Sequence, residues 1–137
     1  MSAESQQVDL PEVLAEVRAA FEAYEIALLR HDLAALHSFF WHGAEVLRYG
    51  VAEHSLGIEG LRRYRAAAPP VDPRRRLHNT VIKTFGRAAA SACTEFTAPG
   101  NPLVGRQMQT WIRFDAAWKI VAAHVSMVDP ALLKLYY

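Results

Sequence analysis

Two arginines, a tyrosine and a histidine could support chemistry on a small anion in this chain. Tyr24 falls on the apolar side of a predicted helix, so its phenol needs a hydrogen-bond partner inside the fold. Arg48 shares a predicted strand face with small apolar residues, and Arg106 and His124 fall on a predicted hairpin. An inward guanidinium binds both oxygens of a carboxylate, and a tyrosine can act as general acid or base. These positions predict a pocket for a small carboxylate-bearing substrate, with Arg48 as the cation beside Tyr24.

Each of these residues also has a purely structural interpretation. Tyr24 could be an ordinary core aromatic residue, Arg48 a surface arginine at a sheet edge, and His124 a hydrogen-bonded structural group. Ser126 lies beside His124 but has no aspartate at a recognisable triad position. Glu53 follows Arg48 in a predicted loop, where it could bind a ligand or cap a helix. Both are kept as candidate substrate-binding residues.

A long hairpin between Gly105 and Val128 is the element that must position several of these groups. Two runs rich in aromatic and β-branched residues flank a short turn at 115–117, which is typical of a β-hairpin. Pairing Phe114 with Trp118 sets Arg106 opposite Ser126 on the predicted pocket floor, with Met108 opposite His124. A one-residue shift would instead turn Gln107 and Gln109 inward and Arg106 outward. Gln109 is therefore also a candidate substrate-binding residue.

The opposite face of this predicted hairpin is too apolar to remain in contact with water. It carries Trp111, Val121, Val125 and Met127 in the predicted register. Monomeric proteins rarely expose a large contiguous apolar patch. The sequence therefore predicts a homodimer that covers this face.

The remaining elements predict an α+β fold. Apolar periodicity predicts helices over 10–31, 32–42 and 57–68, with Asp9 and Asp32 as N-caps of the first two. Strands are predicted over 44–50, 77–85 and 88–97, with a loop at 51–56. The arginine run at 74–76 is interpreted as a solvated strand start rather than a phosphate site. Helices followed by strands predict a cone-shaped curved antiparallel sheet of four or five strands, with three helices on its concave side.

Composition sets the broad class. The 137 residues are 52% hydrophobic and 21% charged, which predicts one domain over 1–137 with an ordered core at about 9–128. A net charge of +1 argues against a nucleic-acid partner. The absence of a signal-like segment or apolar span predicts no membrane association, and one cysteine, Cys93, fits a cytoplasmic protein. Because the sequence has no HExxH, CxxC or Gly-rich phosphate loop, we expect no metal and no cofactor.

Several segments carry a family resemblance. The second helix (Asp-Leu-x-x-Leu-x-x-Phe-Phe) and the final strand (Trp-Lys-Ile-Val-x-x-His-x-Ser) resemble the nuclear-transport-factor-2-like superfamily. Arg48-Tyr49-Gly50 followed by Glu53, the stretch Gly-Arg-Gln-Met-Gln-Thr-Trp and the stretch Val-Ala-Ala-His-Val-Ser resemble the AtzH-like family. Members of that family accompany amidases of cyanuric acid and oxalurate catabolism. The resemblance spans about residues 10–127.

The resemblance implies an amidase that converts 1,3-dicarboxyurea to allophanate. Tyr24 and Arg48 match the positions of the family's proposed catalytic residues. Two other functions remain open. The chain could be a non-catalytic binding or accessory subunit of a partner amidase, because no covalent nucleophile is evident. It could also be a dehydratase or isomerase, as is common in the superfamily, with Glu53 or His124 as the inward acid.

Overall fold

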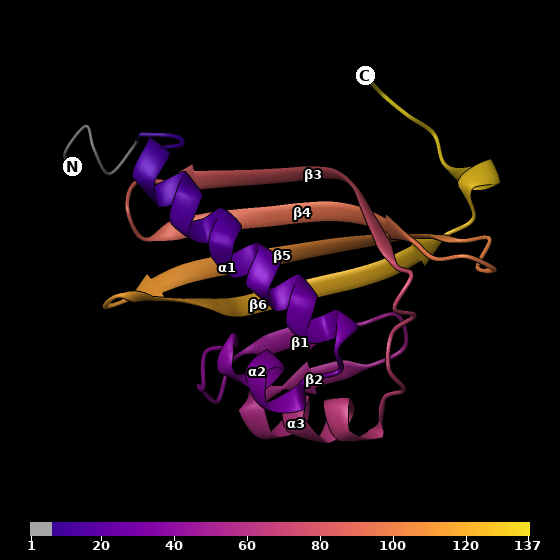
Figure 1. Cartoon of the computed structure of the whole chain (residues 1–137), viewed down its shortest axis with the longest axis horizontal. Coiled ribbons are helices and arrows are strands. Elements are labelled where there is room, and N and C mark those ends of the chain that lie inside the picture. Colours follow the sequence, from indigo (N-terminus) through magenta and orange to yellow (C-terminus); the bar gives the residue numbers. More distant parts are fainter. Residues whose placement is uncertain (1–6) are drawn as a thin grey trace.

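A computed structural model describes residues 7–137 of the chain, and it contains three α-helices and one six-stranded sheet (Figure 1). The helices are α1 (Pro11–Leu29), α2 (Leu33–Ser38) and α3 (Gly57–Ala67), and a 3₁₀ turn, η2 (Pro130–Leu132), follows the last strand. The strands are β1 (Leu47–Tyr49), β2 (His54–Leu56), β3 (Arg76–Phe85), β4 (Ala89–Thr97), β5 (Val104–Phe114) and β6 (Ala117–Val128).

The sheet is curved and has the strand order β2-β1-β6-β5-β4-β3. The predicted α+β class, with three helices packed on a curved sheet, is confirmed. Three details differ from the prediction. The sheet has six strands rather than four or five. Residues 54–56 form β2 rather than part of a loop, and β1 pairs with β6 in parallel, whereas the other neighbours are antiparallel. Parallel strands need a long connection between them, and β2, α3, β3, β4 and β5 lie between β1 and β6 in sequence.

Helix α1 crosses one face of the sheet (Figure 1), which we call the helix-covered face. Its buried side chains recur every three or four residues and form one apolar stripe. They are Val13, Val17, Phe21, Tyr24, Ala27 and Leu28. This stripe and the inward side chains of the sheet make up the core, and Trp111 and Ile120 at its centre have no exposed surface. The stripe fixes Tyr24 against the sheet.

The two predicted helix caps have different outcomes. Asp32 caps α2, since its carboxylate accepts a hydrogen bond of 3.1 Å from the backbone N–H of Ala35. The prediction for Asp9 is wrong, because Leu10 is the residue at the α1 cap position. The carboxylate of Asp9 instead accepts from the Thr84 backbone N–H at 2.9 Å and from the Lys83 ammonium at 2.7 Å. Asp9 therefore ties the start of α1 to β3.

The predicted hairpin between β5 and β6 exists, but the predicted faces are wrong. Arg106 pairs with Ser126 and Met108 with His124, as expected, whereas a bulge beside Thr110 shifts the register toward the turn, so that Phe114 pairs with Ala117. The bulge lets Trp118 and Ile120 share a face with Ala123 and Val125. The helix-covered face consequently receives Gln107, Gln109 and Trp111, while Arg106, Met108 and Thr110 are exposed on the opposite face.

This reversal removes the reason for the predicted homodimer. Trp111 lies in the core, Val125 and Met127 line a cavity, and Val121 is half-buried, so these residues form no exposed patch. The homodimer itself stays a prediction. The opposite face instead carries Met108, whose exposed fraction is 58%. Among residues 7–137, no helix is long and apolar enough to cross a membrane.

Candidate functional site

A cavity of about 550 Å³ lies between the helices and the helix-covered face of the sheet. Its polar lining comes from two helices, two strands and three connecting segments: Tyr24 of α1, Arg48 of β1, Glu53 before β2, Tyr64 and Arg65 of α3, Asp72 and Arg75 before β3, Asn101 before β5, and Gln107 and Gln109 of β5. Apolar side chains such as Leu28, Phe96 and Met127 complete the wall. A concave, mostly apolar space with a few convergent polar groups is the usual form of a small-molecule site.

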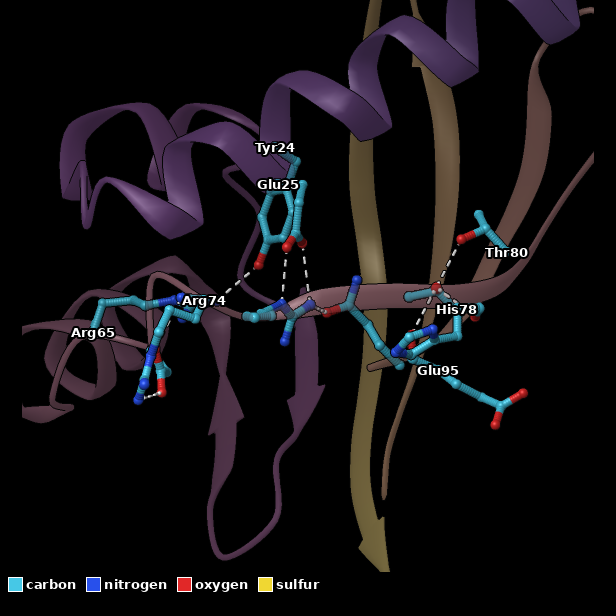
Figure 2. A network of polar contacts seen from close by, with 11 residues as sticks. Tyr24, Glu25, Arg65, Arg74, His78, Thr80 and Glu95 are labelled. Carbon is cyan, nitrogen blue, oxygen red and sulfur yellow. Dashed lines mark hydrogen bonds and ion pairs between the residues drawn. The ribbon is translucent and has the colours of Figure 1, made fainter. Parts of the chain in front are cut away.

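Tyr24 and Arg65 form the central polar contact of the cavity. Arg65 is only 7% exposed and Tyr24 only 3%. The Nη2 group of Arg65 donates a hydrogen bond of 2.8 Å to the phenol oxygen of Tyr24. Figure 2 shows both side chains reaching from their helices toward each other. Because a guanidinium only donates, the phenol's own proton stays available for a ligand or a water.

Arg48 lines the same cavity and has a different partner. It forms an ion pair with Glu53, whose second oxygen accepts from the Ser55 hydroxyl. Its guanidinium also lies 4.4 Å from the centre of the Tyr64 ring, and the guanidinium of Arg65 lies 5.4 Å from the same centre. Tyr64 thus packs against both cations.

Gly50 allows the Arg48–Glu53 pair to form. The chain turns back after β1, and the Gly50 N–H donates to the Glu53 carbonyl at 2.8 Å. A side chain at Gly50 would overlap both the Glu53 carboxylate and the Arg48 guanidinium. A glycine at position 50 is therefore needed for the local packing of the ion pair.

A second arginine–carboxylate pair supports the β5 wall. Arg75 donates to the two carboxylate oxygens of Glu25 at 2.9 and 3.1 Å, and to the Oε1 atom of Gln107 at 3.0 Å. Its guanidinium also lies 4.1 Å from the centre of the Phe96 ring. Glu25 follows Tyr24 on α1 and points into the same interior (Figure 2). The arginine run at 74–76 is therefore not simply a solvated strand start, because Arg75 is a buried part of the cavity.

The charges of the lining do not cancel. Glu53 neutralises Arg48, and Glu25 neutralises Arg75. Asp72 bonds to Arg74, and this hydrogen bond holds the pKa of the Asp72 carboxyl below its usual range. Within residues 7–137, no carboxylate lies within ion-pair distance of Arg65, and its buried Nε–H has no hydrogen-bond partner. The cavity thus contains one uncompensated cation, which favours an anionic ligand.

The structure brings together only part of the predicted site. Tyr24, Arg48, Glu53 and Gln109 line the cavity, but the partner of Tyr24 is Arg65 rather than Arg48. The other three candidates, Arg106, His124 and Ser126, do not line it. The reason is the bulge beside Thr110, because of which these three side chains lie on the face of the sheet opposite the cavity. Arg106 instead donates to Ser126 at 3.2 Å on the opposite face.

Six polar cavity residues were not predicted as site residues: Tyr64, Arg65, Asp72, Arg75, Asn101 and Gln107. Arg65 follows Ile58 and Leu61 at helical spacing, so the apolar stripe of α3 could have placed it inward. The sequence contains no comparable signal that Arg75 points inward, because its partner Glu25 lies far away in the chain. Among residues 7–137, no cluster of histidine, cysteine, aspartate and glutamate has the geometry of a metal site.

Comparison with known proteins establishes the family. The AtzH-like family model matches residues 6–131, nearly the whole chain. This chain belongs to the AtzH-like family. No curated protein matches it.

Solved structures of two relatives share this fold closely. A cystatin-like fold protein from Burkholderia xenovorans LB400 is 48% identical, with a TM-score of 0.87 over 89% of this chain and 96% of its own. A DUF3225 protein of unknown function from Pectobacterium atrosepticum is 47% identical, with a TM-score of 0.87 over 93% of this chain and 98% of its own. A ketosteroid isomerase-like protein from Erwinia carotovora atroseptica is 18% identical, with a TM-score of 0.68 over 88% of this chain and 100% of its own. At this identity the comparison shows a shared fold alone.

Proposed function

We propose that this AtzH-like chain is a hydrolase that acts on a small carboxylated urea, with 1,3-dicarboxyurea as substrate and allophanate as product. The observation that carries the proposal is the Tyr24 phenol, held 2.8 Å from the Nη2 atom of Arg65 in a cavity with one uncompensated cation. A cation there attracts a carboxylate, and the phenol supplies a proton-transfer group beside it. The family resemblance, which marks Tyr24 and Arg48, supports the same substrate class.

The lining suggests how the C–N bond breaks. It includes no serine, cysteine, threonine, lysine or histidine, and its two carboxylates, Glu53 and Asp72, are each bound to an arginine. Water therefore adds its hydroxyl to the terminal carboxyl carbon, and the nitrogen takes a proton as the C–N bond breaks. One carboxylated nitrogen then becomes the NH₂ group of allophanate, and the lost carbon leaves as bicarbonate.

The residues have separate roles in this proposal. Arg48 holds a substrate oxygen through the part of its guanidinium that Glu53 does not engage. Tyr24 delivers a proton to the leaving nitrogen, and Arg65 stabilises the resulting phenolate until it takes up the proton that the attacking water releases. Arg65 also attracts the second carboxylate of a doubly charged substrate.

The test is hydrolysis by the purified chain alone. We expect ¹³C NMR to show 1,3-dicarboxyurea being converted to allophanate and bicarbonate faster than in buffer. An Arg48→Lys variant keeps the charge but loses the forked contact, and we expect it to be at least about tenfold slower. If the chain binds the substrate without accelerating its loss, and acceleration requires an added amidase, it is an accessory subunit and the proposed hydrolase is wrong.

A further inference from the structure

Two glutamines on β5 line the cavity, and the contacts of their amide oxygens fix the orientation of both amides. Gln107 and Gln109 are 4% and 3% exposed, and both line the cavity. They are two residues apart on one strand, so their side chains lie on the same face of the sheet. A neutral amide has a donor end and an acceptor end, and whichever end faces a ligand decides what it can bind.

The partners of Gln107 determine its orientation. Arg75 donates to Oε1 of Gln107 at 3.0 Å, and a guanidinium has no acceptor. Arg75 is itself held by two hydrogen bonds to Glu25. Rotating the amide by half a turn would place two donors against each other. The Gln107 Nε2 group is therefore fixed as the free end, and this buried nitrogen has no hydrogen-bond partner within the described residues.

Gln109 is oriented by the same principle. Its Oε1 atom accepts a hydrogen bond of 3.0 Å from the indole N–H of Trp111, which also only donates. Trp111 is completely buried, so this donor is fixed in the core. Both glutamines consequently keep their oxygens engaged and leave their NH₂ groups as the free ends.

We propose that Gln107 and Gln109 form a donor-only wall that selects a ligand carboxylate and rejects a carboxamide in the same position. A carboxylate oxygen accepts from the unpartnered Gln107 nitrogen, whereas an amide NH₂ group would face another donor. Glu25 and Arg75 are positioning residues, because they act on the ligand through the orientation of Gln107. The inference rests on the proposed function in that the ligand is a small carboxylate, and it does not require catalysis.

The test compares two stable probes, glutarate and its monoamide glutaramate, which differ by one oxygen replaced with NH₂. Calorimetric titration of the wild-type protein should give a dissociation constant at least about tenfold lower for glutarate. Gln107→Glu keeps the size of the side chain and its contact with Arg75, but replaces the free NH₂ with a carboxylate oxygen. We expect this variant to raise the dissociation constant of glutarate by at least about tenfold. The preference for glutarate over glutaramate should then become smaller or reverse.

Two controls make the result specific. Gln7→Glu makes the same chemical change at an exposed residue that does not line the cavity, and both dissociation constants should stay at wild-type values. Gln107→Met removes the amide without adding charge, so if Gln107→Glu fails to fold, Gln107→Met must still show a reduced preference for glutarate. Wild-type preference in both Gln107 variants would overturn the inference, as would the binding of neither probe by wild-type protein. A Gln107-dependent preference in a protein that does not hydrolyse 1,3-dicarboxyurea would refute the proposed function and leave the donor wall intact.

Discussion

Replacing Arg65 by glutamine removes the one cavity cation that has no carboxylate partner in the described chain. At an effective dielectric constant of about 20, a cation and a carboxylate about 4 Å apart attract each other by about 4 kcal/mol. Water in the cavity weakens this attraction, and we expect about 1.4 to 2.8 kcal/mol to be lost. That loss corresponds to a roughly 10- to 100-fold increase in the dissociation constant of glutarate.

The same change should not weaken the folded protein. Burying an unpaired cation costs several kcal/mol, whereas leaving the Tyr24 hydroxyl without its donor costs only about 1–3 kcal/mol. The variant removes the larger of these two costs, the burial of an unpaired cation. The free energy of unfolding of Arg65→Gln should therefore equal or exceed that of the wild type. Lower affinity without lower stability is the pattern expected of a residue that serves ligand binding.

Calorimetry with glutarate and urea unfolding without ligand measure the two quantities. Arg63→Gln is the matched control, because it removes the same charge from an exposed position on α3 that does not line the cavity. We expect the control to keep wild-type affinity. The reasoning is refuted if Arg65→Gln binds glutarate as tightly as the wild type, or if it loses several kcal/mol of stability, since Arg65 would then be a structural residue.

Three further changes have defined outcomes. Tyr24→Phe keeps the ring and removes the proton donor, so kcat for 1,3-dicarboxyurea should fall about 100-fold with little change in KM; wild-type turnover would exclude Tyr24 as the acid. Gly105→Ala places a methyl group where the Phe96 ring lies, and overpacking should lower the unfolding free energy by about 1–3 kcal/mol; an unchanged urea midpoint would contradict this packing. Burial, with help from the nearby cations Arg62 and Arg65, lowers the pKa of His37 below 6.5. The unfolded chain then binds this proton more readily than the folded one, so stability falls as pH drops through and below 6.5. Thermal unfolding of His37→Gln should show a flatter pH dependence over that window, and an identical profile would exclude the linkage.

Local sequence patterns predicted much of the fold and two of the principal site residues. The spacing of apolar residues in α1 predicts that Tyr24 faces inward, and the strand pattern around Arg48 does the same. These predictions succeed because each depends on one uninterrupted element with a fixed period. The inward position of Tyr24 and Arg48 therefore follows from the sequence alone.

The prediction of which hairpin face lines the cavity was wrong for a physical reason. A bulge beside Thr110 changes which side chains share a face, and it occurs where the sequence carries no glycine or proline to mark it. Because of this one extra residue, Gln107 lies at the cavity wall where the prediction had placed Arg106. Arg75 was missed because its inward position depends on Glu25, a residue 50 positions earlier in the chain. Such long-range partners are known only once the fold is known.

The central claim is that the cavity between α1, α3 and the sheet binds a small carboxylate. A crystal structure of the protein with bound glutarate tests it most directly. We expect one carboxylate within about 2.7–3.2 Å of the Arg65 or Arg48 guanidinium, with Nε2 of Gln107 donating to a carboxylate oxygen. Glutarate bound only outside the cavity, or a cavity that holds water alone at saturating glutarate, would contradict the claim.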